Sequence, residues 1–173
     1  MKTSDAIFGI LKDYVDTVFY VPGGGAMHLV DSLGRSGLNA VACLHEQGAG
    51  YAAIGYAMAR NSLGVCLVTS GPGATNAITP CAAAWTDSAP VLFISGQART
   101  DTLIGDTGLR TRGIQEVDIV PMVRGITKYA SQGFHDDIDD INFSLNNVIK
   151  CCLVGRPGPC WLSIPLDVQA EEV

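Results

Sequence analysis

The sequence lacks the features by which several protein classes are recognised. Its 173 residues hold 11 lysines and arginines against 17 acidic residues, and the scattered basic residues predict no basic face for a nucleic acid. No apolar run approaches the ~20 residues of a membrane-spanning helix. The N-terminus reaches Asp5 at once and has neither the basic start nor the cleavage site of a secretion signal. We therefore expect a cytoplasmic protein that binds neither nucleic acid nor membrane.

The sequence also lacks a disulfide or metal-binding framework. Its six cysteines include no C-x-x-C pair: Cys43 and Cys66 lie in apolar, strand-like runs, Cys81 lies in an alanine-rich segment, and Cys151 adjoins Cys152. No spacing of His and Cys suits zinc. We predict small buried thiols and no metal site in this chain.

Strand-like and helix-like segments alternate along the chain. The strands around residues 65–68 and 91–94 are apolar on both faces, which is typical of a parallel sheet covered by helices on both sides. We predict one α/β domain over residues 1–173, with a three-layer, doubly wound, flavodoxin-like fold and about six parallel strands. The predicted strands are residues 17–21, 39–44, 64–69, 90–95, 126–130 and 160–164, and the predicted helices are 3–14, 26–34, 47–60, 74–85, 115–123 and 138–152.

Three segments follow predicted strands directly, at the edge of an open α/β sheet where ligands bind. They are residues 22–25, 45–48 and 70–76. Glu46 stands between a strand and a helix rich in glycine and alanine. A carboxylate there can cap the helix, but Glu is a poor cap, and the small neighbours leave room for a ligand. From the residues alone, both interpretations of Glu46 stay open.

The glycine-rich turn at residues 71–73 stands where phosphate-binding turns occur. It lacks the Gly-Lys-Ser/Thr of a Walker motif, and Asn76 occupies the position of the third glycine in a dinucleotide-binding fingerprint. These departures weaken a nucleotide site, but a non-catalytic nucleotide-binding module of the flavodoxin-like class stays open as an alternative.

The sequence resembles the N-terminal, pyrimidine-binding domain of thiamine-diphosphate enzymes, and acetolactate synthase and its relatives most of all. Two stretches carry the resemblance: HEQGAG at residues 45–50 and VTSGPGATN at residues 68–76. Residues 18–24, 94–97, 115–116, 127–128 and 162–168 also match in order, so the resemblance covers essentially the whole chain. It implies a decarboxylase or carboligase of 2-oxo acids.

The resemblance implies roles for individual residues. In this family a glutamate at the position of Glu46 hydrogen-bonds N1′ of the aminopyrimidine ring of thiamine diphosphate, and a carboxylate suits that role because it must exchange a proton with a weakly basic nitrogen. The implied catalytic residues are Glu46 and Gln115, and the implied cofactor-binding residues are Pro22, Gly23, Gly24, Gly25, Glu46, Gly71, Pro72 and Asn76.

The resemblance also implies that this chain holds half of an active site. In the family a second domain binds the diphosphate and Mg2+ through a Gly-Asp-Gly segment, and this sequence has none. We therefore expect the central and diphosphate-binding domains to be absent from this chain, and the isolated chain to be inactive. The diphosphate-binding domain of the same or another subunit would complete the site, and we expect it to contact residues 47–60 and 74–85. The assembled protein would be a homo-oligomer, a dimer or larger. A separate small subunit of a two-chain decarboxylase is an alternative, and some relatives also bind FAD.

Several positions depart from the acetolactate synthase pattern. Gly25 replaces an alanine, His28 replaces a proline, and Ile114 replaces a phenylalanine. These positions shape the substrate pocket in that family, so the resemblance does not fix which 2-oxo acid is bound. Arg110 and Arg112 either bind an anionic substrate or lie in a solvated loop, and the sequence leaves both open.

Overall fold

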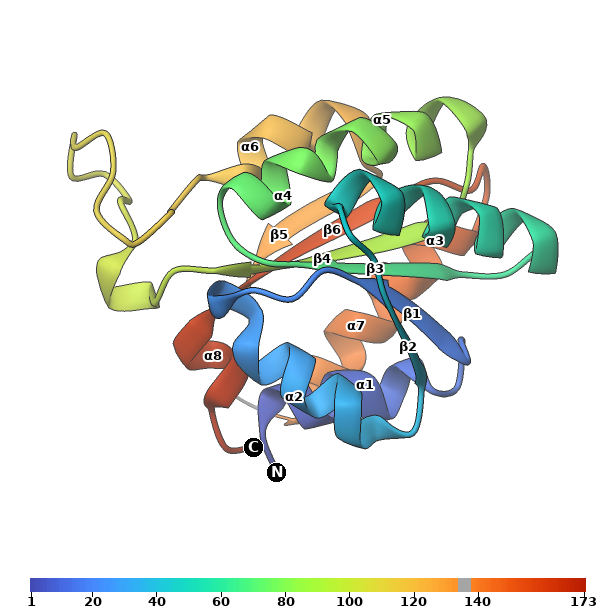
Figure 1. Cartoon of the computed structure of the whole chain (residues 1–173), viewed down its shortest axis with the longest axis horizontal. Coiled ribbons are helices and arrows are strands. Elements are labelled where there is room, and N and C mark those ends of the chain that lie inside the picture. The colour runs from blue at the N-terminus through green and yellow to red at the C-terminus, as the bar shows by residue number, and fades with distance from the viewer. Residues whose placement is uncertain (134–137) are drawn as a thin grey trace.

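A parallel sheet lies at the centre of the fold (Figure 1). The computed structural model describes residues 1–133 and 138–173, and within them six strands pair in the order β2-β1-β3-β4-β6-β5. All of these pairings are parallel, which confirms the predicted α/β fold with a six-stranded parallel sheet. The strands are β1 (Thr17–Tyr20), β2 (Asn39–Ala42), β3 (Gly64–Val68), β4 (Val91–Gln97), β5 (Tyr129–Gln132) and β6 (Cys160–Pro165).

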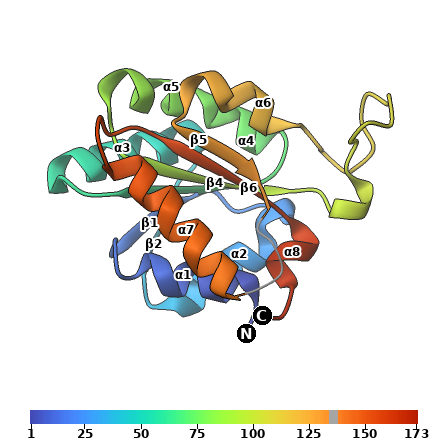
Figure 2. The ribbon, with the colours of Figure 1, turned by 180° about the vertical axis from the view of Figure 1, so that it is seen from behind.

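Helices cover both faces of the sheet, so the fold has three layers (Figures 1 and 2). One face carries α1 (Thr3–Leu11), α2 (Met27–Ser36), α7 (Ile138–Leu153) and α8 (Leu166–Ala170). The other face carries α3 (Glu46–Arg60), α4 (Pro72–Asn76), α5 (Ile78–Asp87) and α6 (Ile119–Val123). Three short 3-10 helices, η1 (Gly24–Ala26), η2 (Thr100–Thr102) and η3 (Arg124–Ile126), lie in the connections.

The central strands divide their side chains between two cores. In β3, Val65 and Leu67 belong to the core shared with α1, α2 and α7, whereas Cys66 and Val68 belong to the core shared with α3, α5 and α6. All four side chains are fully buried. Burial of a large apolar side chain stabilises a fold by about 1.5–3 kcal/mol, which explains why both faces of this strand are apolar.

The structure also bears on the predictions about the cysteines and about membrane-spanning helices. All six cysteines are free. Cys66, Cys81, Cys152 and Cys160 are buried, as predicted, whereas Cys43 and Cys151 are only partly buried. Burial raises the pKa of the Cys66 and Cys81 thiols. In the described residues, none of the helices combines the length and the hydropathy that a membrane crossing needs.

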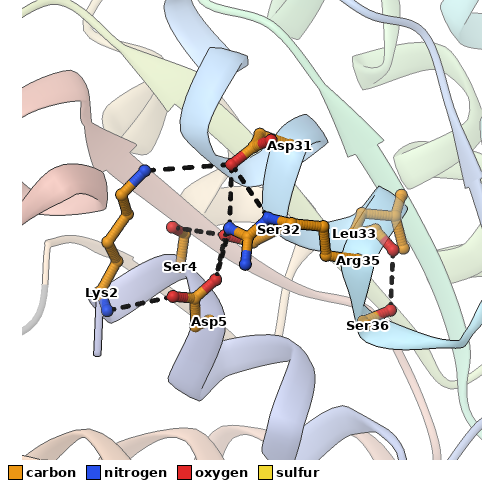
Figure 3. Close-up of polar contacts among 8 residues, drawn as sticks. All are labelled: Lys2, Ser4, Asp5, Asp31, Ser32, Leu33, Arg35 and Ser36. Carbon is orange, nitrogen blue, oxygen red and sulfur yellow. Dashed lines mark hydrogen bonds and ion pairs between the residues drawn. The ribbon is translucent and has the colours of Figure 1, made fainter.

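A polar cluster joins α1 to α2 (Figure 3). The Ser32 hydroxyl donates a hydrogen bond to Asp5 at 2.7 Å, and the Arg35 guanidinium donates to Asp5 at 2.8 Å and to Asp31 at 2.9 Å. The Ser32 hydrogen bond, helped by the backbone N–H of Lys2 and by Arg35, holds the pKa of Asp5 below its usual range despite partial burial. The cluster fixes how the two helices pack.

Several predicted elements are wrong in their extent. The helix predicted at residues 3–14 ends at Leu11, and the strand predicted at residues 126–130 begins only at Tyr129. Residues 74–85 form two helices, α4 and α5, which meet at Ala77. Pro80 lies in the first turn of α5, where its missing N–H costs no helical hydrogen bond, whereas in one continuous helix its ring would clash with the carbonyl of Asn76. The helix predicted at residues 115–123 begins only at Ile119, because Gln115 has a left-handed backbone with φ +52°.

Candidate functional site

The predicted segments lie at the carboxyl ends of the strands, near the point where the chain reverses its winding direction. Strand β1 pairs with β2 on one side and with β3 on the other, and the helices that follow β1 and β2 cover opposite faces of the sheet. Loops at such a switch point diverge and leave a crevice beyond the carboxyl ends of the strands. Residues 22–25 and 69–73 leave β1 and β3 at this point, so the fold places two of the three predicted segments there.

Glu46 is the first residue of α3, but it does not cap the helix. The cap is His45, whose ring Nδ1 accepts a hydrogen bond from the backbone N–H of Gln47 at 3.1 Å. The half-buried Glu46 carboxylate instead accepts a hydrogen bond from the side-chain amide of Asn76, with 2.9 Å between Nδ2 and Oε2. The structure thus brings two predicted site residues into direct contact.

Gly73 lets α4 approach the Glu46 carboxylate closely. A Cβ at this position would lie 2.6 Å from Cγ2 of Thr69 and 3.3 Å from Oε1 of Glu46, so a larger residue would displace both. In the described part of the chain, Oε1 of Glu46 accepts no hydrogen bond, whereas Oε2 is held by Asn76. One carboxylate oxygen is therefore oriented by the protein and the other is available to a ligand.

The predicted loops interlock through glycines. Gly71 has φ +57° and ψ −119°, a conformation that only glycine adopts without strain, and a Cβ there would lie 2.0 Å from the carbonyl oxygen of Gln115. The backbone N–H of Gly25 donates to the hydroxyl of Thr69 at 3.1 Å, and a Cβ at Gly25 would lie 2.3 Å from Oγ of Ser70. The loops after β1 and β3 and the segment around Gln115 are thus packed as one unit.

A cavity of about 370 Å3 opens beside these loops. Gly24, Gly25 and Gln115, which were predicted as site residues, are among the residues that line it. The other predicted residues lie outside the lining. Gly23 packs against the side chain of Thr69, while Pro22 and Pro72 are exposed at the same edge. Among the predicted residues, Glu46 and Asn76 therefore form one group, and Gly24, Gly25 and Gln115 form another, against which Gly71 packs.

Sequence reasoning assigned no role to several residues that build this site. Ser70 and Gln97 line the cavity, and both fall inside stretches that carry the family resemblance, so a signal for them was present. Gln169 is fully buried, and its amide donates to the carbonyl oxygens of Gly25 and Ile164 at 2.8 Å each. The polar composition of residues 165–173 gave no indication that one of them supports the glycine loop.

Comparison with protein families gives an independent result. The family described as "Thiamine pyrophosphate enzyme, N-terminal TPP binding domain" matches residues 1–122 of the chain. The chain belongs to this family. The match confirms the resemblance found in the sequence, and thiamine pyrophosphate, another name for thiamine diphosphate, is the cofactor that this family of domains binds.

Known relatives of this thiamine pyrophosphate enzyme domain include several acetolactate synthases. The chain is 41% identical to acetolactate synthase isozyme 2 large subunit of Escherichia coli over 90% of its own length and 27% of that protein. It is 41% identical to acetolactate synthase large subunit of Corynebacterium glutamicum over 100% of its length and 27% of the relative. It is 40% identical to the mitochondrial acetolactate synthase catalytic subunit of Saccharomyces cerevisiae over 92% of its own length and 22% of that protein. The chain thus spans about a quarter of the length of these relatives.

Proposed function

We propose that the chain binds the aminopyrimidine ring of thiamine diphosphate in an enzyme that decarboxylates or joins 2-oxo acids, as an acetolactate synthase does. The observation that carries this proposal is the arrangement of Glu46. One of its carboxylate oxygens, Oε2, is held by Asn76 at 2.9 Å, and the other, Oε1, accepts no hydrogen bond from the described residues. Membership of the thiamine pyrophosphate enzyme family supports this choice over a nucleotide-binding module.

The residues at this edge fit the pyrimidine end of the cofactor. A ring nitrogen that exchanges a proton needs a carboxyl group within hydrogen-bond reach, and Oε1 of Glu46 meets that need. Asn76 keeps the carboxylate in one orientation, and the absence of a side chain at Gly73 lets α4 and Thr69 pack closely against that carboxylate. When bound, thiamine diphosphate supplies a nucleophilic thiazolium carbon and takes up electrons during decarboxylation.

Gln115 and the glycine loop are proposed to face the substrate. Gly24, Gly25 and Gln115 line the cavity beside the Glu46 group, so a 2-oxo acid there would lie next to the cofactor. The Gln115 side chain makes no hydrogen bond to the described residues and can donate to a substrate oxygen. Its backbone is fixed against Gly71, so the amide is carried by a rigid segment.

A partner domain is proposed to complete the site by holding the diphosphate and Mg2+. In the described residues no group of three or more His, Cys, Asp or Glu is placed to hold a metal ion. The face formed by α3 and α5 is the proposed docking surface. It exposes Tyr51 at 49%, Met58 at 59% and Trp85 at 42%, which is much apolar area for two neighbouring helices. The partner belongs to the same or another subunit.

The proposal is tested by reconstitution. The chain is combined with a diphosphate-binding domain, either fused as in its relatives or added as a separate protein, and CO2 release from pyruvate is measured with and without thiamine diphosphate and Mg2+. We expect release that depends on the cofactor and on both domains. Tight nucleotide binding by this edge, with no effect of thiamine diphosphate in the assembled protein, would overturn the proposal. Sedimentation of the mixture shows whether the two parts associate.

A further inference from the structure

One wall of the cavity is formed by the long segment between β4 and α6. Residues 98–118 leave the carboxyl end of β4 and project beyond the sheet before α6 begins (Figure 1). They carry no regular structure apart from η2, yet they form one side of the cavity of about 370 Å3. Long irregular segments of this kind often carry binding residues.

The carboxylate of Glu116 holds this segment in place. It accepts hydrogen bonds from the backbone N–H of Ile104 and, at 2.9 Å, from that of Gly113. The side-chain amide of Gln97 donates to the carbonyl oxygen of Val117 at 2.8 Å, which fixes the base of the segment. Arg112 adjoins Gly113 and lines the cavity, so the Glu116 carboxylate positions its backbone at the cavity wall.

The cavity carries positive charge that the chain does not neutralise. Two arginines line it, and Arg99 is paired with Asp101 at 3.1 Å. Arg112 makes no ion pair or hydrogen bond with any described residue, and none of the described residues in the lining is Asp or Glu. An unpaired guanidinium beside a half-enclosed space favours a carboxylate, sulfonate or phosphonate, which it can bind through two parallel hydrogen bonds.

The cavity also offers neutral hydrogen-bonding groups. Ser70 is 4% exposed and lines the cavity, and its hydroxyl makes no hydrogen bond to the described residues. The side-chain amide of Gln115 also makes no hydrogen bond to the described residues, and Met27 and Leu166 add apolar surface to the lining. The cavity thus offers neutral hydrogen-bond donors for one anionic group and an unpaired cation for a second.

We propose that this cavity binds a 2-oxo acid that carries a second anionic group, and that Arg112 pairs with this second group. The proposal rests on the 2-oxo acid chemistry proposed above and adds the class of substrate. Arg112 is then a residue that determines specificity, because it favours dianionic over monoanionic 2-oxo acids without contacting the reacting carbon.

The test is a binding experiment on the 173-residue chain, without cofactor or turnover. The 15N-labelled chain is titrated with 2-oxoglutarate and with 2-oxopentanoate, which has the same chain length but no second carboxylate. The amide signals of Gly25, Gly113 and Gln115 report binding. We expect 2-oxoglutarate to bind about tenfold more tightly, the size expected for one charge-assisted hydrogen-bonded pair.

Two matched variants assign the effect. Arg112→Gln should abolish the preference for 2-oxoglutarate. Arg112 and Arg110 are both exposed residues of the same segment, but only Arg112 lines the cavity, so Arg110→Gln should keep the preference. The proposal would be overturned if the two acids had equal titration midpoints in the unmodified chain, or if neither acid shifted the amide signals. It would also be overturned if both variants lost the preference for 2-oxoglutarate to the same extent. Because no cofactor is involved, these results are independent of cofactor-dependent CO2 release, which judges the proposed function separately.

Discussion

The side-chain amide of Asn76 donates a hydrogen bond to Oε2 of Glu46 across 2.9 Å, and this contact joins the first turn of α3 to the end of α4. An ionised carboxylate only accepts hydrogen bonds, so the nitrogen of the Asn76 amide must face it. The contact leaves Oε1 of Glu46 as the oxygen available to a ligand. Asn76 is therefore a positioning residue for Glu46.

Replacing Asn76 tests this positioning role. Asn76→Ala leaves the Glu46 carboxylate in place but removes the donor that orients it, so proton exchange at C2 of bound thiamine diphosphate should slow by about tenfold, the effect of losing one hydrogen bond of about 1.4 kcal/mol. The exchange rate is followed by NMR after a deuterium pulse in the assembled enzyme. A rate unchanged from that of the unmodified enzyme would show that Asn76 does not position the carboxylate.

Gly71 is expected to be essential for the packing of the site loops. Gly71→Ala places a Cβ 2.0 Å from the carbonyl oxygen of Gln115 and forces a strained backbone, so the free energy of unfolding should fall by about 3 kcal/mol. The matched control is Gly24→Ala, because no atom lies within 4 Å of its Cβ position. The control should change stability by less than about 0.5 kcal/mol in urea unfolding. Similar losses in both variants would contradict the proposed interlocking of the loops.

The cluster between α1 and α2 makes stability depend on pH. The pKa of Asp5 is lowered in the folded chain, chiefly by the Ser32 hydroxyl. Its contribution is therefore present above the unfolded-state pKa of about 4 and is lost as the pH falls through the lower folded-state value. Asp5→Asn should reduce the free energy of unfolding by about 1 kcal/mol at pH 7, and this deficit should shrink in strong acid.

Asp31→Asn serves as the control for this cluster. Asp31 is 54% exposed and pairs only with exposed cations, so its replacement should cost less than that of Asp5. Urea unfolding of the three proteins between about pH 2 and pH 7 gives the comparison. A deficit of the Asp5 variant that stays constant over this range would show that the Asp5 carboxylate is not stabilised in its ionised form.

The fold and the edge that bears the site followed from local sequence pattern. Strands β3 and β4 are apolar on both faces, which predicts a parallel sheet with helices on both sides. The position of Glu46 just after a strand predicts that Glu46 lies at the carboxyl edge of the sheet. The break between α4 and α5 was also readable, since Pro80 excludes a continuous helix. These features depend on residues close together in the chain.

The details of the site depend on contacts between distant residues and were not readable. Gly25 and Gln169 are 144 positions apart, and only the folded chain shows that the amide of Gln169 supports the glycine loop. The left-handed backbone of Gln115 likewise follows from its packing against Gly71 rather than from its own preference. Tertiary packing overrides local propensity at such positions.

The most direct test of the central claim is proton exchange at C2 of thiamine diphosphate bound to the assembled enzyme, measured for Glu46→Gln. The control is Glu172→Gln, which removes the same charge at a residue near the C-terminus. The backbone of Glu172 forms an isolated β-bridge with that of Lys2. If Glu46 exchanges a proton with the cofactor, the Glu46 variant should slow exchange by about a hundredfold or more while the control matches the unmodified enzyme. Exchange at the unmodified rate in a correctly folded, cofactor-loaded Glu46→Gln enzyme would contradict the assignment of Glu46.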